Sequence, residues 1–232
     1  PHGPGAEDGS GYGHTGTVYG ATLTSDRFGM SNRAYHFSLS SYIQLIDDTI
    51  LYIGSNDYTI SAWVKLDTIA TMRIFSHGSI SCGTSSNVPG YMLRTSSSNQ
   101  IHQELTCSSS GRCGLNSELG TSLSVNKWYH ITNTVQRGGS GIIYINGVQD
   151  SFKYGVSSCS VDYASGAFIG YSPQTASTEQ FYGSIDEVRI YQRALTANEV
   201  SQLYTYESNT TSNTIISVAS LSVGFGNCTL NS

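Results

Sequence analysis

The carboxylates of the sequence do not form the pattern that sugar hydrolysis requires. Glycoside hydrolases place two carboxylates about 5–10 Å apart across the sugar, one to donate a proton and one to attack or activate water. No E-x-D-x-x-E run occurs, and Glu104 and Glu118 are isolated. Asp186 and Glu187 are adjacent in a predicted strand, so we expect their side chains to point to opposite faces. We therefore expect that the protein is not an enzyme.

The histidines likewise do not form a catalytic metal site. Neither H-E-x-x-H nor H-x-H spacing occurs, and the chain has no G-x-S-x-G elbow, phosphate-binding loop or dinucleotide fingerprint. His36 and His130 fall within predicted strands, where packing or hydrogen bonding is the more common role. The histidines are His2, His14, His36, His77, His102 and His130.

The five cysteines indicate an oxidising compartment. Cys107 and Cys113 flank a short loop that a local disulfide would close, which leaves Cys82 and Cys159 as the second pair. Three connectivities exist for these four residues, and the sequence does not choose among them. Cys228 is left over, as a free thiol, an intermolecular bridge or a residue whose partner lies outside this sequence.

Two N-glycosylation sequons, at Asn209 and Asn227, add support for secretion. We therefore expect a secreted, extracellular or cell-surface protein. The chain opens with "PHGPGAEDGSG" rather than a signal peptide, which suggests a mature or excised form.

The charge of the chain excludes some partners. The formal net charge is −5 and only 12% of the residues are charged, about half of the roughly 25% usual in globular proteins. Its Lys and Arg residues are scattered singly, whereas nucleic-acid binding needs a basic face. No apolar run approaches the length of a membrane span. We expect neither a nucleic-acid partner nor a transmembrane segment.

Short strands separated by Gly, Ser and Asn clusters predict an all-β protein. In "YTISAWVKL" the residues Ile60, Ala62, Val64 and Leu66 share one face. The strands "KWYHITNTV" and "SGIIYI" pair through "QRGGS", and Asn146-Gly147 predicts a two-residue type I′ hairpin. This spacing of strands and turns predicts a two-sheet antiparallel jelly-roll sandwich.

One short helix is predicted near the C-terminus. Thr196 and Glu199 form a capping box, and Val200, Leu203 and Tyr204 supply an apolar face. We place the domain at residues 1–206 and a Ser/Thr-rich linker with a β-prone tail at 207–232. The tail is uncharged and lacks proline, so an unpaired tail would risk aggregation. Its assembly-prone residues are Ile215, Ile216, Val218, Leu221, Val223 and Cys228.

Four stretches, in order, resemble the laminin-G-like, concanavalin A-like jelly-roll family. They are "DGSGYGHTGTVYGATLTSDRFGMSNRAYHFS", "YTISAWVKL", "NKWYHITNTVQRGGSGIIYINGVQ" and "FYGSIDEVRIYQRALTANEVSQLY", and they cover roughly residues 8–204. The resemblance implies a mostly non-catalytic extracellular module that binds glycans or cell-surface proteins, or serves in adhesion. It also implies that Trp63 and Trp128 are packing residues.

The resemblance further implies one structural Ca²⁺ where the opening turn meets the last strand of the body. Asp8 and Asp186 would be its carboxylate ligands, and backbone carbonyls near Gly11 and His14 would complete the shell. The mixture of carboxylates and carbonyls suits calcium, and the glycines of the turn let the backbone curl inward. Tyr12 and His14 stand where the family usually has Asn, so a side-chain amide ligand is missing at these positions. Without the metal, the same residues would be a Gly-rich turn capped by Asp8.

The family usually has an apolar strand before this turn, whereas "PHGPGAE" is not a strand. We therefore expect an open edge that the tail fills, within its own chain or in a neighbouring copy. The second arrangement would make the protein a structural subunit of a filament or surface assembly. A tail that stays outside the fold is the remaining alternative.

For ligand binding, the long loop "SHGSISCGTSSNVPGY" is the predicted variable surface, because function in sandwiches concentrates in loops. Its predicted ligand-facing residues are His77, Asn87 and Tyr91.

Overall fold

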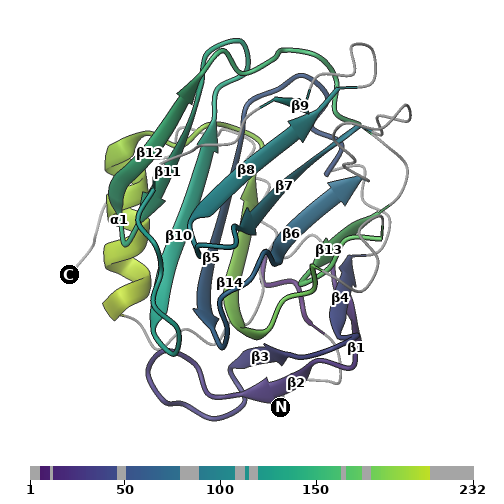
Figure 1. The fold of residues 1–232 in the computed structure, drawn as a ribbon, viewed down its shortest axis with the longest axis vertical. Helices are drawn as coiled ribbons and strands as arrows, with labels where there is room; N and C mark the ends of the chain where they lie inside the picture. The colour runs from purple at the N-terminus through teal and green to yellow at the C-terminus, as the bar shows by residue number, and fades with distance from the viewer. Residues whose placement is uncertain are drawn as a thin grey trace, which may run out of the picture.

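The structure, a computed structural model, is a sandwich of two seven-stranded antiparallel sheets with one helix on its outside (Figure 1). It describes residues 6–10, 13–45, 51–78, 89–107, 120–162, 166–173 and 179–209, and the backbone of 113–114. This architecture confirms the predicted jelly roll with one short C-terminal helix.

We call the first sheet the front sheet. Alternation along its strands separates core from surface: on β4, Ile43 and Leu45 face the core, whereas Tyr42 and Gln44 face outward. In spatial order the strands are β1 (Gly16–Tyr19), β4 (Tyr42–Leu45), β13 (Ala167–Ile169), β6 (Arg73–Gly78), β7 (Gly90–Thr95), β8 (Ile101–Thr106) and β9 (Cys113–Gly114).

We call the second sheet the back sheet. The predicted inward face at residues 60, 62, 64 and 66 is confirmed, because all four side chains are fully buried in the core. In spatial order the strands are β12 (Val148–Tyr154), β11 (Ser140–Ile145), β10 (Trp128–Val135), β5 (Tyr58–Leu66), β14 (Gly183–Tyr191), β3 (Ala34–Phe37) and β2 (Thr22–Thr24).

The predicted hairpin turn joins β11 to β12. Asn146 and Gly147 both have positive φ, 52° and 76°, as a type I′ turn requires. A Cβ at position 147 would also lie 3.0 Å from the side chain of Tyr204, so the turn and the helix pack closely here.

The edge beside β1 is paired at one point in the described part of the chain. Ala6 forms an antiparallel bridge with Gly16, through N–H···O bonds of 3.2 and 2.8 Å, and its side chain is 1% exposed in the core. A single small residue therefore pairs with the start of β1, and the filling of this edge by the tail stays a prediction. The predicted tail residues 215–228 lie outside the described residues.

Helix α1 (Ala197–Asn209) begins with the predicted capping box. The Thr196 hydroxyl accepts from the Glu199 amide at 3.3 Å, and Glu199 accepts from the Thr196 amide at 2.8 Å. The helix continues three residues past the predicted domain end at 206, because Glu207 is fully buried against the back sheet. Among the described residues, no helix has the length and apolarity needed to cross a membrane.

One disulfide, Cys107–Cys159, joins the segment after β8 to the segment after β12, with Cα atoms 5.7 Å apart. Of the three connectivities that the sequence left open, this bond belongs to the one that pairs Cys107 with Cys159, rather than to the one in which Cys107 and Cys113 close a local loop. The sandwich brings residues 52 positions apart to one end, where Arg137 also donates to the Ser157 carbonyl at 2.7 Å. Cys82, Cys228 and the side chain of Cys113 lie outside the described part of the chain.

Candidate functional site

Two of the three predicted ligand-facing residues, His77 and Tyr91, are buried inside the sandwich. His77 and Tyr91 are 2% and 0% exposed, because the alternation of β6 and β7 turns both into the sandwich. The Tyr91 hydroxyl donates to the Leu51 carbonyl at 3.0 Å, and the His77 and Tyr91 rings stack at 5.1 Å. Burial lowers the pKa of His77 to about 4, which keeps its imidazole neutral. Asn87 lies outside the described residues.

Aromatic side chains that the sequence did not single out gather on the outer face of the front sheet. Tyr19 of β1 stacks on Tyr42 of β4 with ring centroids 4.7 Å apart, and Tyr42 stacks on Tyr171 at 4.9 Å. Phe168 of β13 meets Tyr42 and Tyr171 edge-on at 6.0 and 5.6 Å. We call these four residues the aromatic ladder.

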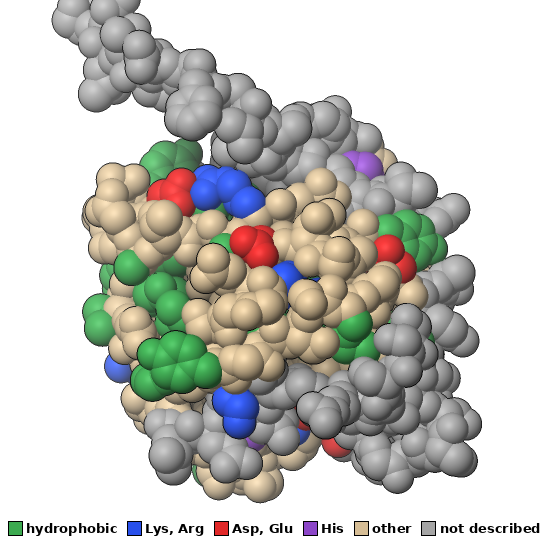
Figure 2. Space-filling view, turned by 90° about the horizontal axis from the view of Figure 1, so that it is seen from above, with side chains coloured by type: hydrophobic (Ala, Val, Ile, Leu, Met, Phe, Trp, Pro, Cys, Tyr) green, Lys and Arg blue, Asp and Glu red, His purple; other side chains and the backbone are tan. Residues whose placement is uncertain are grey.

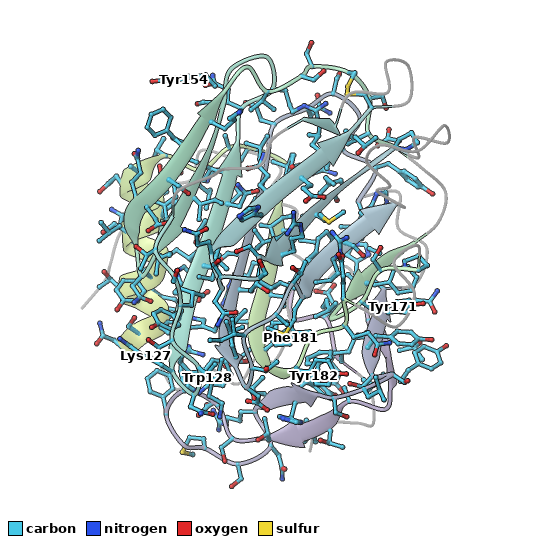
Figure 3. All side chains as sticks on the ribbon, in the orientation of Figure 1. Lys127, Trp128, Tyr154, Tyr171, Phe181 and Tyr182 are labelled. Atoms are coloured by element: carbon cyan, nitrogen blue, oxygen red, sulfur yellow. A yellow bond between two sulfur atoms is a disulfide. The ribbon has the colours of Figure 1, made fainter. Side chains whose placement is uncertain are left out.

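The rings of the ladder are partly exposed to solvent on one side and packed against the sheet on the other. Phe168 is 7% exposed and forms its base, whereas Tyr19 is 43% exposed and Tyr42 and Tyr171 are partly buried. The Ser76 hydroxyl donates to the Tyr171 carbonyl at 2.7 Å, which holds the segment after β13 against the sheet. Tyr171 lies at the side of the molecule away from α1 (Figure 3). The rings therefore offer stacking surface that the core does not use.

The ladder and the two polar residues beside it carry no charge. Burial first, and then the neighbouring hydroxyls of Tyr19 and Tyr171, raise the pKa of Tyr42, so its phenol stays protonated and can donate a hydrogen bond. Thr17 and Gln44, paired in register beside the rings, add uncharged polar groups. Figure 2 views the molecule from above, and on that end charged side chains lie only singly or in small groups.

Farther along the same sheet, two arginines and two glutamates neutralise one another. Arg94 donates to Glu104 through Nε at 2.5 Å, and Arg73 pairs with Glu179. The Arg73 side chain is 5% exposed. Glu104, which appeared isolated in the sequence, is thus held by a cation.

The outer face of the back sheet is closed by α1. Glu207 on the helix accepts from Trp63 Nε1 at 2.8 Å and Arg189 Nε at 2.6 Å, and lies 3.3 Å from His130 Nε2. Its backbone carbonyl accepts from Arg27 at 3.0 and 2.6 Å. Burial raises the pKa of Glu207, but the hydrogen bond from His130 and the charges of His130 and Arg189 outweigh it, so the net pKa is lowered. We call these residues the helix-anchoring network.

Trp63 is a packing residue, as predicted, and it packs under the helix, outside the sandwich. Tyr204 stacks on the Trp63 ring at 5.9 Å and the Arg27 guanidinium lies 4.7 Å from it. Trp128, also predicted to be a packing residue, is partly buried on the same face, with Lys65 Nζ 5.6 Å from its ring.

The prediction that Asp186 and Glu187 point to opposite faces is wrong. A bulge between Asp186 and Arg189, with Glu187 at φ 48°, breaks the alternation. Asp186 accepts from Arg27 and Glu187 from Arg189, each at 2.7 Å, and both arginines also hold Glu207. Burial and then the charge of Glu187 raise the pKa of Asp186 against the pull of Arg27.

The carboxylates predicted to bind calcium, Asp8 and Asp186, accept hydrogen bonds from groups of the protein. Asp8 accepts from the Ser10 amide at 2.8 Å, the Ser10 hydroxyl at 2.7 Å and the His14 amide at 2.9 Å, as the cap of a glycine-rich turn. Asp186 is neutralised by a buried guanidinium, so it does not fit the role of a calcium ligand. The described residues contain no group of three or more metal-ligating side chains, and Gly11 lies outside them. Calcium at the Asp8 turn stays a prediction.

The sequence agrees with the architecture. A family model, Laminin_G_3 of the concanavalin A-like lectin/glucanases superfamily, matches residues 37–201. The chain belongs to this superfamily. Comparison with curated proteins found no match.

Solved structures share the superfamily fold at low sequence identity. The binding domain of Paraclostridial Mosquitocidal Protein 1 is 20% identical with a TM-score of 0.66, over 88% of this chain and 50% of that one. The binding domain of botulinum neurotoxin serotype G is 20% identical with a TM-score of 0.62, over 87% and 48%. This chain thus spans about half the length of both.

A third structure matches over nearly its whole length. Domain 4 of AbnA, a GH43 extracellular arabinanase from Geobacillus stearothermophilus, in complex with arabinotriose, is 22% identical with a TM-score of 0.60. The match covers 86% of this chain and 92% of that domain. At these identities the comparisons establish the fold.

Proposed function

We propose that this chain is a non-catalytic, extracellular module that binds glycans through the aromatic ladder. The observation that carries the proposal is the run of three stacked tyrosines, with centroid spacings of 4.7 and 4.9 Å, left partly open on one face. Sugar rings present apolar C–H faces to aromatic rings and hydroxyls to polar groups at the rim. The ladder supplies rings, phenol hydroxyls and the neighbouring Gln44 and Thr17.

A binding role rather than hydrolysis is supported by the partners of the carboxylates. Glu104, Asp186, Glu187 and Glu207 each contact an arginine, whereas a glycoside hydrolase needs two carboxyl groups that flank the sugar. The ladder itself contains no carboxylate.

An extracellular location is supported by the Cys107–Cys159 disulfide, because such bonds persist in oxidising compartments. Among the relatives, the AbnA domain holds arabinotriose and the two toxin domains are binding domains. These roles belong to those proteins, and they make a glycan or a glycosylated surface a reasonable first ligand to test.

The test begins with a glycan array probed with the full chain, followed by calorimetry on the best glycan. We expect Tyr42→Ala to weaken binding by at least about tenfold, or 1.4 kcal/mol, because it removes the central ring of the stack. Tyr42→Phe keeps the ring and should cost less.

Tyr206→Ala is the matched control, because Tyr206 is 61% exposed but lies on α1. Equal affinity of Tyr42→Ala and the unaltered chain for every bound glycan would rule out the ladder as the site. Binding to no glycan would rule out the glycan-binding function itself.

A further inference from the structure

A cleft of about 310 Å³ lies on the outer face of the back sheet, beside the start of α1. Thr134, Gln136, Ser140 and Ile142 come from β10, β11 and their connection, and Leu195 precedes the helix. Asp57 closes one side. Its volume is at the low end of the roughly 300–1,000 Å³ of small-ligand pockets, which suits a ligand the size of one sugar ring.

The walls of this cleft combine an apolar floor with uncharged polar groups. Leu195 is 7% exposed and Ile142 is partly buried, and both belong to the small apolar cluster under α1. Within the described chain, no hydrogen bond occupies the side-chain hydroxyl of Ser140 or the side-chain amide of Gln136. One oxygen of Asp57 accepts from the Arg137 amide at 2.7 Å. No Lys, Arg or His lines the cleft.

Two exposed aromatic rings stand next to the cleft on the edge strand β12. Tyr154 pairs in register with Ser140, and Phe152 with Ile142, so each ring lies across from a lining residue on the same face. Phe152 and Tyr154 are 50% and 74% exposed, and their centroids are 5.0 Å apart. Neither ring belongs to a core cluster, so their apolar surface is available to a ligand.

We infer that this cleft, together with Phe152 and Tyr154, is a second binding site, for a neutral polyhydroxylated ligand of monosaccharide size. The hydroxyl, amide and carboxylate groups match the hydroxyls of such a ligand, and the rings match its C–H faces. The carboxylate of Asp57 and the absence of a lining cation disfavour an acidic ligand.

The two sites face opposite ways. The aromatic ladder lies outside the front sheet and the cleft outside the back sheet, and Tyr171 and Tyr154 mark them on opposite sides of the molecule (Figure 3). A module with both sites would hold two glycan chains at once and gain avidity on a dense glycan surface. The second site does not rest on the first.

The experiment is an NMR titration of the ¹⁵N-labelled full chain with glucose, galactose, mannose and arabinose, and with glucuronate as an acidic comparison. We expect saturable shifts of the Gln136, Ser140 and Ile142 amides, with Kd in the millimolar range, from at least one neutral sugar and weaker shifts from glucuronate. Tyr154→Ala and Gln136→Ala should each weaken this binding by about tenfold.

Tyr206→Ala, which changes an exposed ring that does not line the cleft, serves as the control that leaves these shifts unchanged. Both test residues are exposed, and the spectrum of each variant reports its fold before sugar is added. No shift at these three amides with any neutral sugar, or shifts that survive both variants unchanged, would overturn the second site. Because ladder binding is read separately at Thr17 and Gln44, failure of one site is distinguishable from failure of the other.

Discussion

The two outer faces of the sandwich use the same kinds of aromatic residue in opposite ways. Under α1, the Trp63 and Tyr204 rings stack at 5.9 Å, and the Trp63 N–H is bonded to a fully buried carboxylate. On the front sheet, Tyr19, Tyr42 and Tyr171 stack more closely, at 4.7 and 4.9 Å, but keep open surface. Stacked rings therefore indicate a binding surface only where no element of the chain covers them.

The largest effect is expected on the covered face, when Glu207 is replaced. Glu207→Ala leaves Trp63, His130 and Arg189 without the carboxylate that they share. We expect a loss of about 3–5 kcal/mol in the free energy of unfolding, measured by urea denaturation. Glu199→Ala, which removes the capping carboxylate of the same helix, should cost only about 1 kcal/mol. A loss at Glu207 no larger than at Glu199 would contradict the anchoring role.

Two truncations distinguish the contribution of Glu207 to stability from that of the tail. A chain that ends at residue 206 should lose as much stability as Glu207→Ala, since it lacks the same carboxylate. A chain that ends at 209 should change by less than about 0.5 kcal/mol, because it keeps the whole of α1. Size-exclusion chromatography of both would report the tail: polymers of the full chain that vanish on ending it at 209 would support the predicted strand exchange.

A pH titration tests the burial of the His77 ring, which contrasts with the open rings of the ladder. His77 is neutral inside the sandwich, with its pKa lowered to about 4 by burial, whereas the imidazole of an unfolded chain protonates near pH 6.5. The stability that this neutral ring contributes is present above pH 6.5 and is lost as the pH falls toward 4. The expected loss is roughly 3 kcal/mol, measured as the difference from His77→Phe, which cannot titrate. Parallel pH profiles of the two proteins would contradict it.

The smallest effect on stability is expected in the ladder itself. Tyr19→Ala removes the ring with the most exposed surface, so we expect less than about 0.5 kcal/mol of destabilisation. Glycan binding should nevertheless weaken about threefold to tenfold. A melting temperature that falls while glycan affinity stays constant would make Tyr19 a structural residue, like Trp63.

The features that were predictable from the sequence are those encoded locally. The alternation at residues 60–66, the Asn146-Gly147 turn and the Thr196–Glu199 box each involve neighbours in the chain, and all three are confirmed. The direction in which a strand residue faces is less secure. A bulge reverses this direction at Glu187. His77 and Tyr91, predicted to lie in a loop, belong to β6 and β7 and therefore face the core.

The candidate site was missed because its members are far apart in the sequence. Tyr19, Tyr42 and Tyr171 meet only when β1, β4 and β13 pair. A signal was present, because Tyr42 and Gln44 alternate with Ile43 and Leu45, and Phe168 stands between Ala167 and Ile169. The Cys107–Cys159 pairing likewise depends on which sheet edges meet, which loop length does not reveal.

The same disulfide sets how the protein would respond to a mechanical pull. A force applied through the two ends of the chain passes along the covalent path from Cys107 directly to Cys159, so strands β9 to β12 are not stretched along their own backbone. The covalent loop withholds 52 residues, or about 180 Å of extended chain, until the bond is reduced. Under tension, strands β1 to β8 before Cys107 and β13, β14 and α1 after Cys159 would be drawn out first, while the hairpin of β11 and β12 lies inside the covalent loop.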